Sequence, residues 1–201
     1  MSTSNSLSVA RKPRFSRAAV VASLALASAT IGSSSAIAAI ICSNFPAPVD
    51  VPATIDGAYV NFATGVVNLA GTVAGWDFNA YQTGGNLRFF TSTNAANTNR
   101  IVGTGTTADV LPAGTMIDGS SPLTTAGIVN PGALLGGVTN GYVGVAFNNE
   151  GTATTNYAWV SLSTTGPTGY PVTINQYCYQ DDGSGIMAGT TPVSLQSYSV
   201  D

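Results

Sequence analysis

Three stretches in the second half of the chain decide its fold: Gly141-Tyr-Val-Gly-Val-Ala-Phe147, Tyr157-Ala-Trp-Val-Ser-Leu162 and Val172-Thr-Ile-Asn-Gln-Tyr-Cys-Tyr179. Each is rich in β-branched and aromatic residues, which favour strands. Clusters of Gly, Asn, Asp, Thr and Pro at 148–151, 165–169 and 181–185 are typical of tight turns. The three stretches are therefore predicted to be strands joined by turns.

The first half of the chain carries the same kind of signal in shorter pieces. Residues 58–62 and 66–70 are short strand candidates, and residues 76–81 alternate, with Trp76, Phe78 and Ala80 expected on one side. A Gly-Gly-Asn turn then leads into 87–91, which predicts a hairpin. The Pro- and Gly-rich residues 119–137 are expected to form a long loop. Because no long segment has helical spacing, we expect an all-β, two-sheet sandwich or jelly-roll-like domain.

The N-terminus has the order of a secretory signal peptide. Four basic residues between 11 and 17 precede the apolar run 18–27, and Ala36-Ile-Ala38 supplies a cleavage site. The alternative, a membrane anchor, needs about 20 strongly apolar residues, and this run is diluted by Ser, Thr and Gly. We expect residues 1–39 to be a signal peptide and residues 40–201 a single secreted domain without a transmembrane segment. The expected location is extracellular or cell-surface, with the periplasm as an alternative.

Removal of the leader makes the chain strongly acidic. Arg88 and Arg100 are its two remaining basic residues against nine acidic ones, so the net charge becomes −7, compared with −3 for the whole chain. Two cations cannot neutralise many phosphates, so nucleic acid is not an expected partner. An anionic membrane surface is disfavoured for the same reason.

The chain contains two cysteines, Cys42 and Cys178. In an oxidising compartment the simplest interpretation of such a pair is a disulfide, which would close most of the exported chain into one loop. The alternative is two free thiols.

The residue types that the chain lacks exclude the common catalytic machinery. It has no histidine, and its only lysine, Lys12, lies in the predicted leader. A Ser-His-Asp triad, a P-loop lysine, a Schiff base and a His-ligated metal are therefore excluded. Carboxylates remain for a glycoside hydrolase, which needs two. The available ones are Asp77, Glu150, Asp181 and Asp182. The alternative interpretation places three of these in turns and leaves Asp77 facing solvent, so we do not expect an enzyme.

Two kinds of binding site are candidates. Asp56, Asp181 and Asp182 lie in Asp-Gly turns whose oxygens could bind calcium, although neither turn has the spaced calcium-loop pattern and ordinary acidic turns are the alternative. Trp76, Tyr81 and Trp159 are candidates for stacking on sugars. Both tryptophans lie in alternating strands, where burial in the core is the competing expectation.

The late strand segments resemble a group of largely uncharacterised bacterial exported proteins that often carry a PEP-CTERM sorting tail. The resemblance rests on the strands 141–147 and 157–162, on Ile174-Asn-Gln-Tyr-Cys-Tyr-Gln-Asp181, and on Ile186-Met-Ala-Gly189, with Gly75-Trp-Asp-Phe-Asn79 and Ile55-Asp-Gly57 as earlier landmarks. Residues 193–201 lack the Pro-Glu-Pro, apolar span and basic end of that tail. The resemblance implies an exported β-sandwich and no catalytic residues.

Together these features predict a secreted or cell-surface structural and interaction protein. Only 7% of its residues are charged, so polar, weakly charged strand faces could associate laterally. Self-association or a surface polysaccharide are the expected partners. The alternative function is a carbohydrate-binding module, and exposure of the aromatic rings on one face would favour it.

Overall fold

A computed structural model describes residues 38–192 except 93–97 and 125. The described part of the chain is all-β, as predicted. It contains two main antiparallel sheets, one of six strands and one of five. The predicted signal peptide lies outside the described residues apart from its last two positions.

The six-stranded sheet contains the three segments that dominate the sequence. Its order is β1-β14-β13-β12-β7, and β2 also pairs with β14. Its strands are β1 (Ile40–Cys42), β2 (Val49–Val51), β7 (Asn99–Ile101), β12 (Gly141–Asn149), β13 (Thr154–Thr164) and β14 (Val172–Gln180). The three long strands are consecutive neighbours because short turns connect them.

The five-stranded sheet has the order β11-β6-β5-β3-β4. Its strands are β3 (Ala58–Val60), β4 (Val67–Asn68), β5 (Phe78–Thr83), β6 (Asn86–Phe90) and β11 (Ile128–Val129). The predicted hairpin is β5–β6, and Thr83 pairs with Asn86 across its two-glycine turn. Both turn glycines have positive φ, 58° and 79°, which L-residues rarely adopt.

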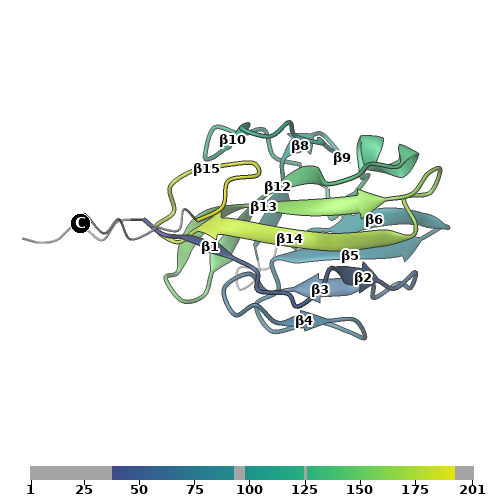
Figure 1. The fold of residues 1–201 in the computed structure, drawn as a ribbon, viewed down its shortest axis with the longest axis horizontal. Coiled ribbons are helices and arrows are strands. Elements are labelled where there is room, and N and C mark those ends of the chain that lie inside the picture. Colours follow the sequence, from purple (N-terminus) through teal and green to yellow (C-terminus); the bar gives the residue numbers. More distant parts are fainter. Residues whose placement is uncertain (1–37, 93–97, 125, 193–201) are drawn as a thin grey trace, which may run out of the picture. The chain divides into compact units, whose positions relative to one another are not determined.

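Side chains from both sheets form one apolar core, in a β-sandwich-like arrangement. Phe62, Phe78 and Phe89 from the five-stranded side pack in the same cluster as Phe147 and Tyr177 from the six-stranded side. Figure 1 shows β13 and β14 in front of β5 and β6. Alternate residues of each strand face this core, and the residues between them form the two outer faces.

The outer face of the six-stranded sheet is partly covered by connecting segments. These include the two-stranded sheets β8 (Gly103–Thr104) with β9 (Thr107–Ala108) and β10 (Met116–Ile117) with β15 (Ile186–Met187). Ile117 and Ile186 from these segments form a second buried cluster with Trp159 and Cys178. Gly144 permits the covering, because a Cβ there would lie 2.6 Å from Val102 Cγ2.

Buried asparagines tie loops to the sheets. The side-chain amide of Asn79 donates to the carbonyls of Asp56 and Ala58, and that of Asn156 donates to the carbonyl of Gln180. A buried polar side chain is tolerated when its hydrogen bonds are made, and these amides bond backbone carbonyls at or beside the ends of β3 and β14. The high Asn content of the chain therefore serves the fold as well as its surface.

Two local expectations were wrong. Residues 119–137 were expected to be a loop, but they contain β11 and a 3₁₀-helix, Gly132–Gly136, which is the only helix in the described part of the chain. Trp76 was expected on the same side as Phe78 and Ala80. It lies instead at the end of a turn before β5, so strand alternation does not extend to it, and only Phe78 and Ala80 join the main core. In the described part of the chain, no helix is long and apolar enough to cross a membrane.

Candidate functional site

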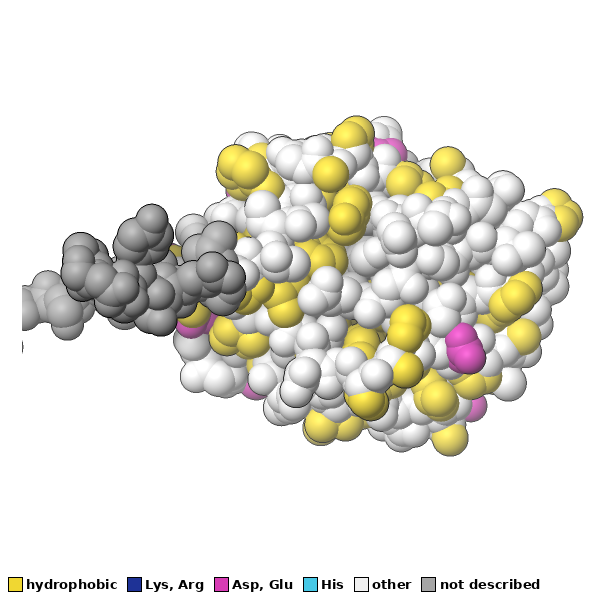
Figure 2. Space-filling model, in the orientation of Figure 1, with side chains coloured by type: hydrophobic (Ala, Val, Ile, Leu, Met, Phe, Trp, Pro, Cys, Tyr) yellow, Lys and Arg dark blue, Asp and Glu magenta, His cyan; other side chains and the backbone are white. Residues whose placement is uncertain are grey.

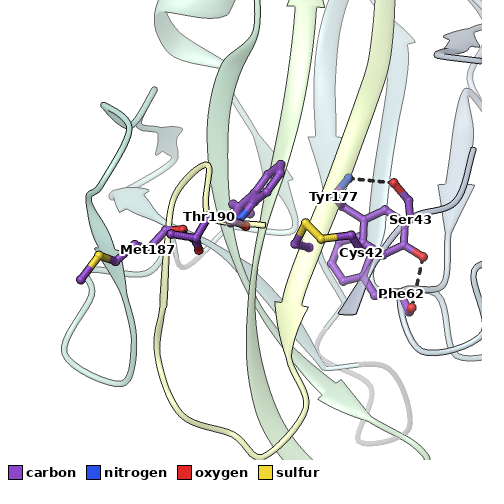
Figure 3. The surroundings of a disulfide bond; sticks show 8 residues. Cys42, Ser43, Phe62, Tyr177, Met187 and Thr190 are labelled. Carbon is purple, nitrogen blue, oxygen red and sulfur yellow. Dashed lines mark hydrogen bonds between the residues drawn. A yellow bond between two sulfur atoms is a disulfide. The ribbon is translucent and has the colours of Figure 1, made fainter. Parts of the chain in front are cut away.

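The predicted disulfide between Cys42 and Cys178 is confirmed. The two residues lie directly opposite each other on β1 and β14, with a sequence separation of 136. Ser43 follows Cys42 and makes two hydrogen bonds to Tyr177. Its hydroxyl accepts from the Tyr177 N–H (Figure 3). Its own N–H donates to the Tyr177 carbonyl. The N-terminal strand is thus fixed covalently and by hydrogen bonds. Disulfides persist in oxidising, non-cytoplasmic compartments, which is the location that this bond supports.

The calcium candidates lie in two separate turns. Asp56 precedes β3, whereas Asp181 and Asp182 follow β14. Asp181 accepts a 2.8 Å hydrogen bond from the Ala39 N–H, and Asp182 accepts one of 2.9 Å from the Ser184 N–H. No three side chains of the metal-binding types Asp, Glu, Cys and His come together among the described residues. The two turns therefore do not combine into one site.

Asp77 is buried, which corrects the expectation that it faces solvent. It is 2% exposed, and its Oδ2 accepts a 2.7 Å hydrogen bond from the Phe62 N–H. Burial raises the pKa of Asp77 from 3.8 to about 8; the Phe62 hydrogen bond opposes this rise, and the charge of Glu150 adds to it. The turn before β5 directs the side chain inward. Its burial leaves no surface for a substrate to reach.

The sugar-stacking candidates are also buried. Trp159 is 2% exposed, and its indole N–H donates to the Thr190 carbonyl at 3.1 Å. Trp76 and Tyr81 are each 5% exposed. Trp159 belongs to the six-stranded sheet and Tyr81 to the five-stranded sheet, so the structure does not bring the three rings together on one exposed face.

The outer face of the five-stranded sheet carries an exposed apolar patch that the sequence did not reveal. We call it the aromatic face; the exposed Ile55, Phe90 and Ile128, the half-buried Tyr59 and the buried Tyr81 line a hollow of about 230 Å³, which Asn79 also lines. Ile55 is 66% exposed, Ile128 56% and Phe90 38%. At one end the Trp76 ring contacts the rings of Tyr59 and Phe90, with centroids 5.3 and 5.7 Å away.

The signal for this patch is the pair Phe89-Phe90. Neighbouring residues of a strand point to opposite faces, so one phenylalanine must leave the core. Phe89 is fully buried in the core, while Phe90 faces outward opposite Ile128 of β11. Ile128 was missed because it lies in the segment that was expected to be a loop.

A charged residue stands on each side of the aromatic face. Arg88 lies on β6 directly opposite Tyr81 of β5. Asp56 lies in the loop on the other side of β5, where a Cβ on Gly57 would come 2.5 Å from the Tyr81 Cα. Burial raises the pKa of Tyr59, and the negative charge of Asp56 raises it further. The patch is therefore apolar at its centre and carries opposite charges at two margins.

The uncovered part of the six-stranded sheet's outer face forms a second hollow, of about 400 Å³. We call it the polar groove. Its lining residues are Ser43, Phe45, Asn140, Tyr142, Trp159, Ser161, Asn175, Gln176, Gly189 and Thr191. None of them is charged. In the view of Figure 2, which has β13 and β14 in front, Asp and Glu side chains are few and no Lys or Arg side chain is visible.

Comparison of the chain with protein-family models, with curated proteins and with solved structures finds no match. Its function must therefore be inferred from the fold and from the chemistry of the two outer faces.

Proposed function

We propose that this chain is an exported, non-catalytic structural protein that associates with copies of itself through the aromatic face. The observation that carries the proposal is the exposure of Ile55, Phe90 and Ile128 on one outer sheet face. A contiguous exposed apolar patch, unlike scattered apolar residues, is a common mark of an interaction surface. Aromatic residues and Arg are also enriched at protein interfaces.

The margins of the patch favour a second copy of the chain as the occupant. Symmetric dimers use the same surface on both subunits, so each residue of the patch meets a counterpart from the other side of the axis. Asp56 and Arg88 flank Tyr81 on opposite sides, and no ion pair joins them within the described chain. A two-fold axis that runs along β5 near Tyr81 would bring Asp56 of one copy to Arg88 of the other.

Low charge supports association, and the lack of catalytic groups supports a structural role. Only 7% of the residues are charged, and Asp56 and Arg88 beside the aromatic face have opposite signs, so the net charge of −7 expected after leader removal opposes association through this face only weakly. The chain has no histidine, and Asp77, the carboxyl group with the strongly raised pKa, is buried. The disulfide supports a location outside the cytoplasm.

Sedimentation velocity over a concentration series tests this proposal. We expect the sedimentation coefficient of the wild type to rise with concentration and that of Ile128→Asp to stay at the monomer value. Met187→Asp is the matched control, because Met187 is an exposed apolar residue, 45% accessible, on β15 outside the aromatic face. A wild type that is monomeric throughout, or association of Ile128→Asp equal to that of wild type, would refute the proposal.

A further inference from the structure

We infer that the polar groove is a binding site for a neutral saccharide. The groove lies on the six-stranded sheet, on the opposite side of the core from the aromatic face, so saccharide binding there does not depend on self-association. Its floor is a row of three residues from neighbouring strands: Tyr142 of β12 lies opposite Ser161 of β13, which lies opposite Gln176 of β14. All three point away from the core.

A β-bulge adds a fourth polar residue to this floor. The pairing of β13 with β14 shifts between Ser161 and Leu162, so that Ser161 faces Gln176 while Leu162 faces Ile174. Asn175 is the extra residue, and both Asn175 and Gln176 lie between the core residues Ile174 and Tyr177. A bulge re-aims side chains and is frequent beside binding sites. Here it sets two amides side by side in the groove.

One end of the groove is held in a fixed arrangement. The Asn175 side-chain amide donates to Asn140 Oδ1 at 3.0 Å and to Ser163 Oγ at 2.9 Å. It also reaches Ser161 Oγ at 3.4 Å. Donors and acceptors whose positions are fixed in advance lose little freedom when a ligand binds. This network therefore holds the Asn175 side chain in place, and its carbonyl oxygen makes no hydrogen bond within the described chain.

Two other polar groups of the floor are not used in hydrogen bonds within the protein. Within the described chain, neither the Tyr142 hydroxyl nor the Gln176 side-chain amide makes a hydrogen bond. Gly189, at φ +82°, borders the groove beside Tyr142, and a Cβ there would lie 2.9 Å from the Tyr142 hydroxyl oxygen. Glycine at this position thus keeps the hydroxyl accessible.

The chemistry of the lining selects the ligand class. Amides and hydroxyls match the alternating donors and acceptors of sugar hydroxyls, and the Tyr142 ring, packed edge-on against Trp159 at 5.4 Å, offers an apolar surface for a pyranose face. The lining holds no cation to attract phosphate or uronate, and no carboxylate to attract an amine. The volume of about 400 Å³ lies within the range of small-ligand pockets.

Isothermal titration calorimetry with defined oligosaccharides tests this inference. The neutral probes are maltohexaose, cellohexaose, xylohexaose and mannohexaose; the charged probes are hexagalacturonate and chitosan hexamer. We expect at least one neutral probe to bind and neither charged probe to bind more tightly. Tyr142→Ala and Gln176→Ala should each weaken that binding about tenfold or more. Each removes a polar group that would bond the ligand and has no other partner within the described chain.

Thr155→Ala is the matched control, because Thr155 is exposed on the same outer face of β13 but outside the groove. It should bind as the wild type does. Tyr142→Phe, which keeps the ring, should lose less affinity than Tyr142→Ala, and circular dichroism of each variant confirms that it is folded. No binding of the neutral panel at millimolar concentration, preferential binding of a charged probe, or binding that all the groove variants retain would overturn the inference.

Discussion

The carboxylate of Asp77 accepts a 2.7 Å hydrogen bond from the backbone N–H of Phe62, inside the protein rather than at its surface. Burial is the main reason that the pKa of Asp77 rises from 3.8 to about 8. Between about pH 4 and pH 8 the folded protein therefore holds a proton that the unfolded chain releases. The contribution of Asp77 to stability is full below pH 4 and is lost as the pH rises through 8.

We predict that the free energy of unfolding of the wild type falls between pH 5 and pH 8, by up to about 1.4 kcal/mol per pH unit from this group. Asp77→Asn carries no charge at any pH and should remove this slope. Urea unfolding at several pH values measures it. Equal slopes for the two proteins would show that Asp77 ionises normally in the folded state.

Two glycines with the same φ allow the cost of backbone strain to be measured separately from the cost of a steric clash. Gly57 and Gly84 both have φ 58°, but a Cβ on Gly57 would lie 2.0 Å from the Ala80 carbonyl oxygen, whereas nothing lies within 4 Å of one on Gly84. Gly84→Ala should cost about 1–2 kcal/mol, the strain of a left-handed L-residue. Gly57→Ala should cost about 1–3 kcal/mol more. Chemical denaturation of the two variants compares the costs, and similar values would contradict the close approach of this loop to β5.

Loss of the disulfide should destabilise the protein by about 2–5 kcal/mol, because the bond closes a loop spanning 136 positions and fixes β1 to β14. Unfolding of the wild type with and without dithiothreitol measures this difference. Cys42→Ala combined with Cys178→Ala is the control and should not respond to the reductant. A wild type whose stability is the same in both conditions would argue that the bond constrains little.

The parts of the fold that sequence predicted are those with long local patterns. The strands 141–149, 154–164 and 172–180 each contain enough alternating residues to define a period, and the hairpin at 84–86 has a distinctive two-glycine turn. Strands of two or three residues, such as β10 and β11, carry no measurable period. They form because distant segments supply a partner, which a local pattern cannot show.

The candidate sites also differ in whether a local sequence pattern marks them. The cysteine pair was predictable because Cys42 and Cys178 are the only two cysteines in the sequence, so each has a single possible partner within the chain. Asp77 was wrongly expected to face solvent because the strand alternation was extended back to residues 76 and 77, which precede β5. The polar groove depends on a one-residue bulge at Asn175 and on loops that cover only part of a sheet, and neither leaves a distinct mark in the sequence.

We propose that two copies of the chain meet through the aromatic face, with Asp56 of one copy near Arg88 of the other. A charge-reversal experiment tests this arrangement. Asp56→Arg alone places two arginines together at each symmetric contact, and Arg88→Asp alone places two carboxylates there, so each variant should sediment as a monomer. In an equimolar mixture both contacts become opposite-charge pairs.

Sedimentation velocity of the mixture is the deciding measurement. We expect the mixed variants to recover the association of the wild type and each variant alone to remain monomeric at the same total concentration. A mixture that stays monomeric while the wild type associates, or single variants that associate as well as the wild type, would show that Asp56 and Arg88 do not meet across the interface.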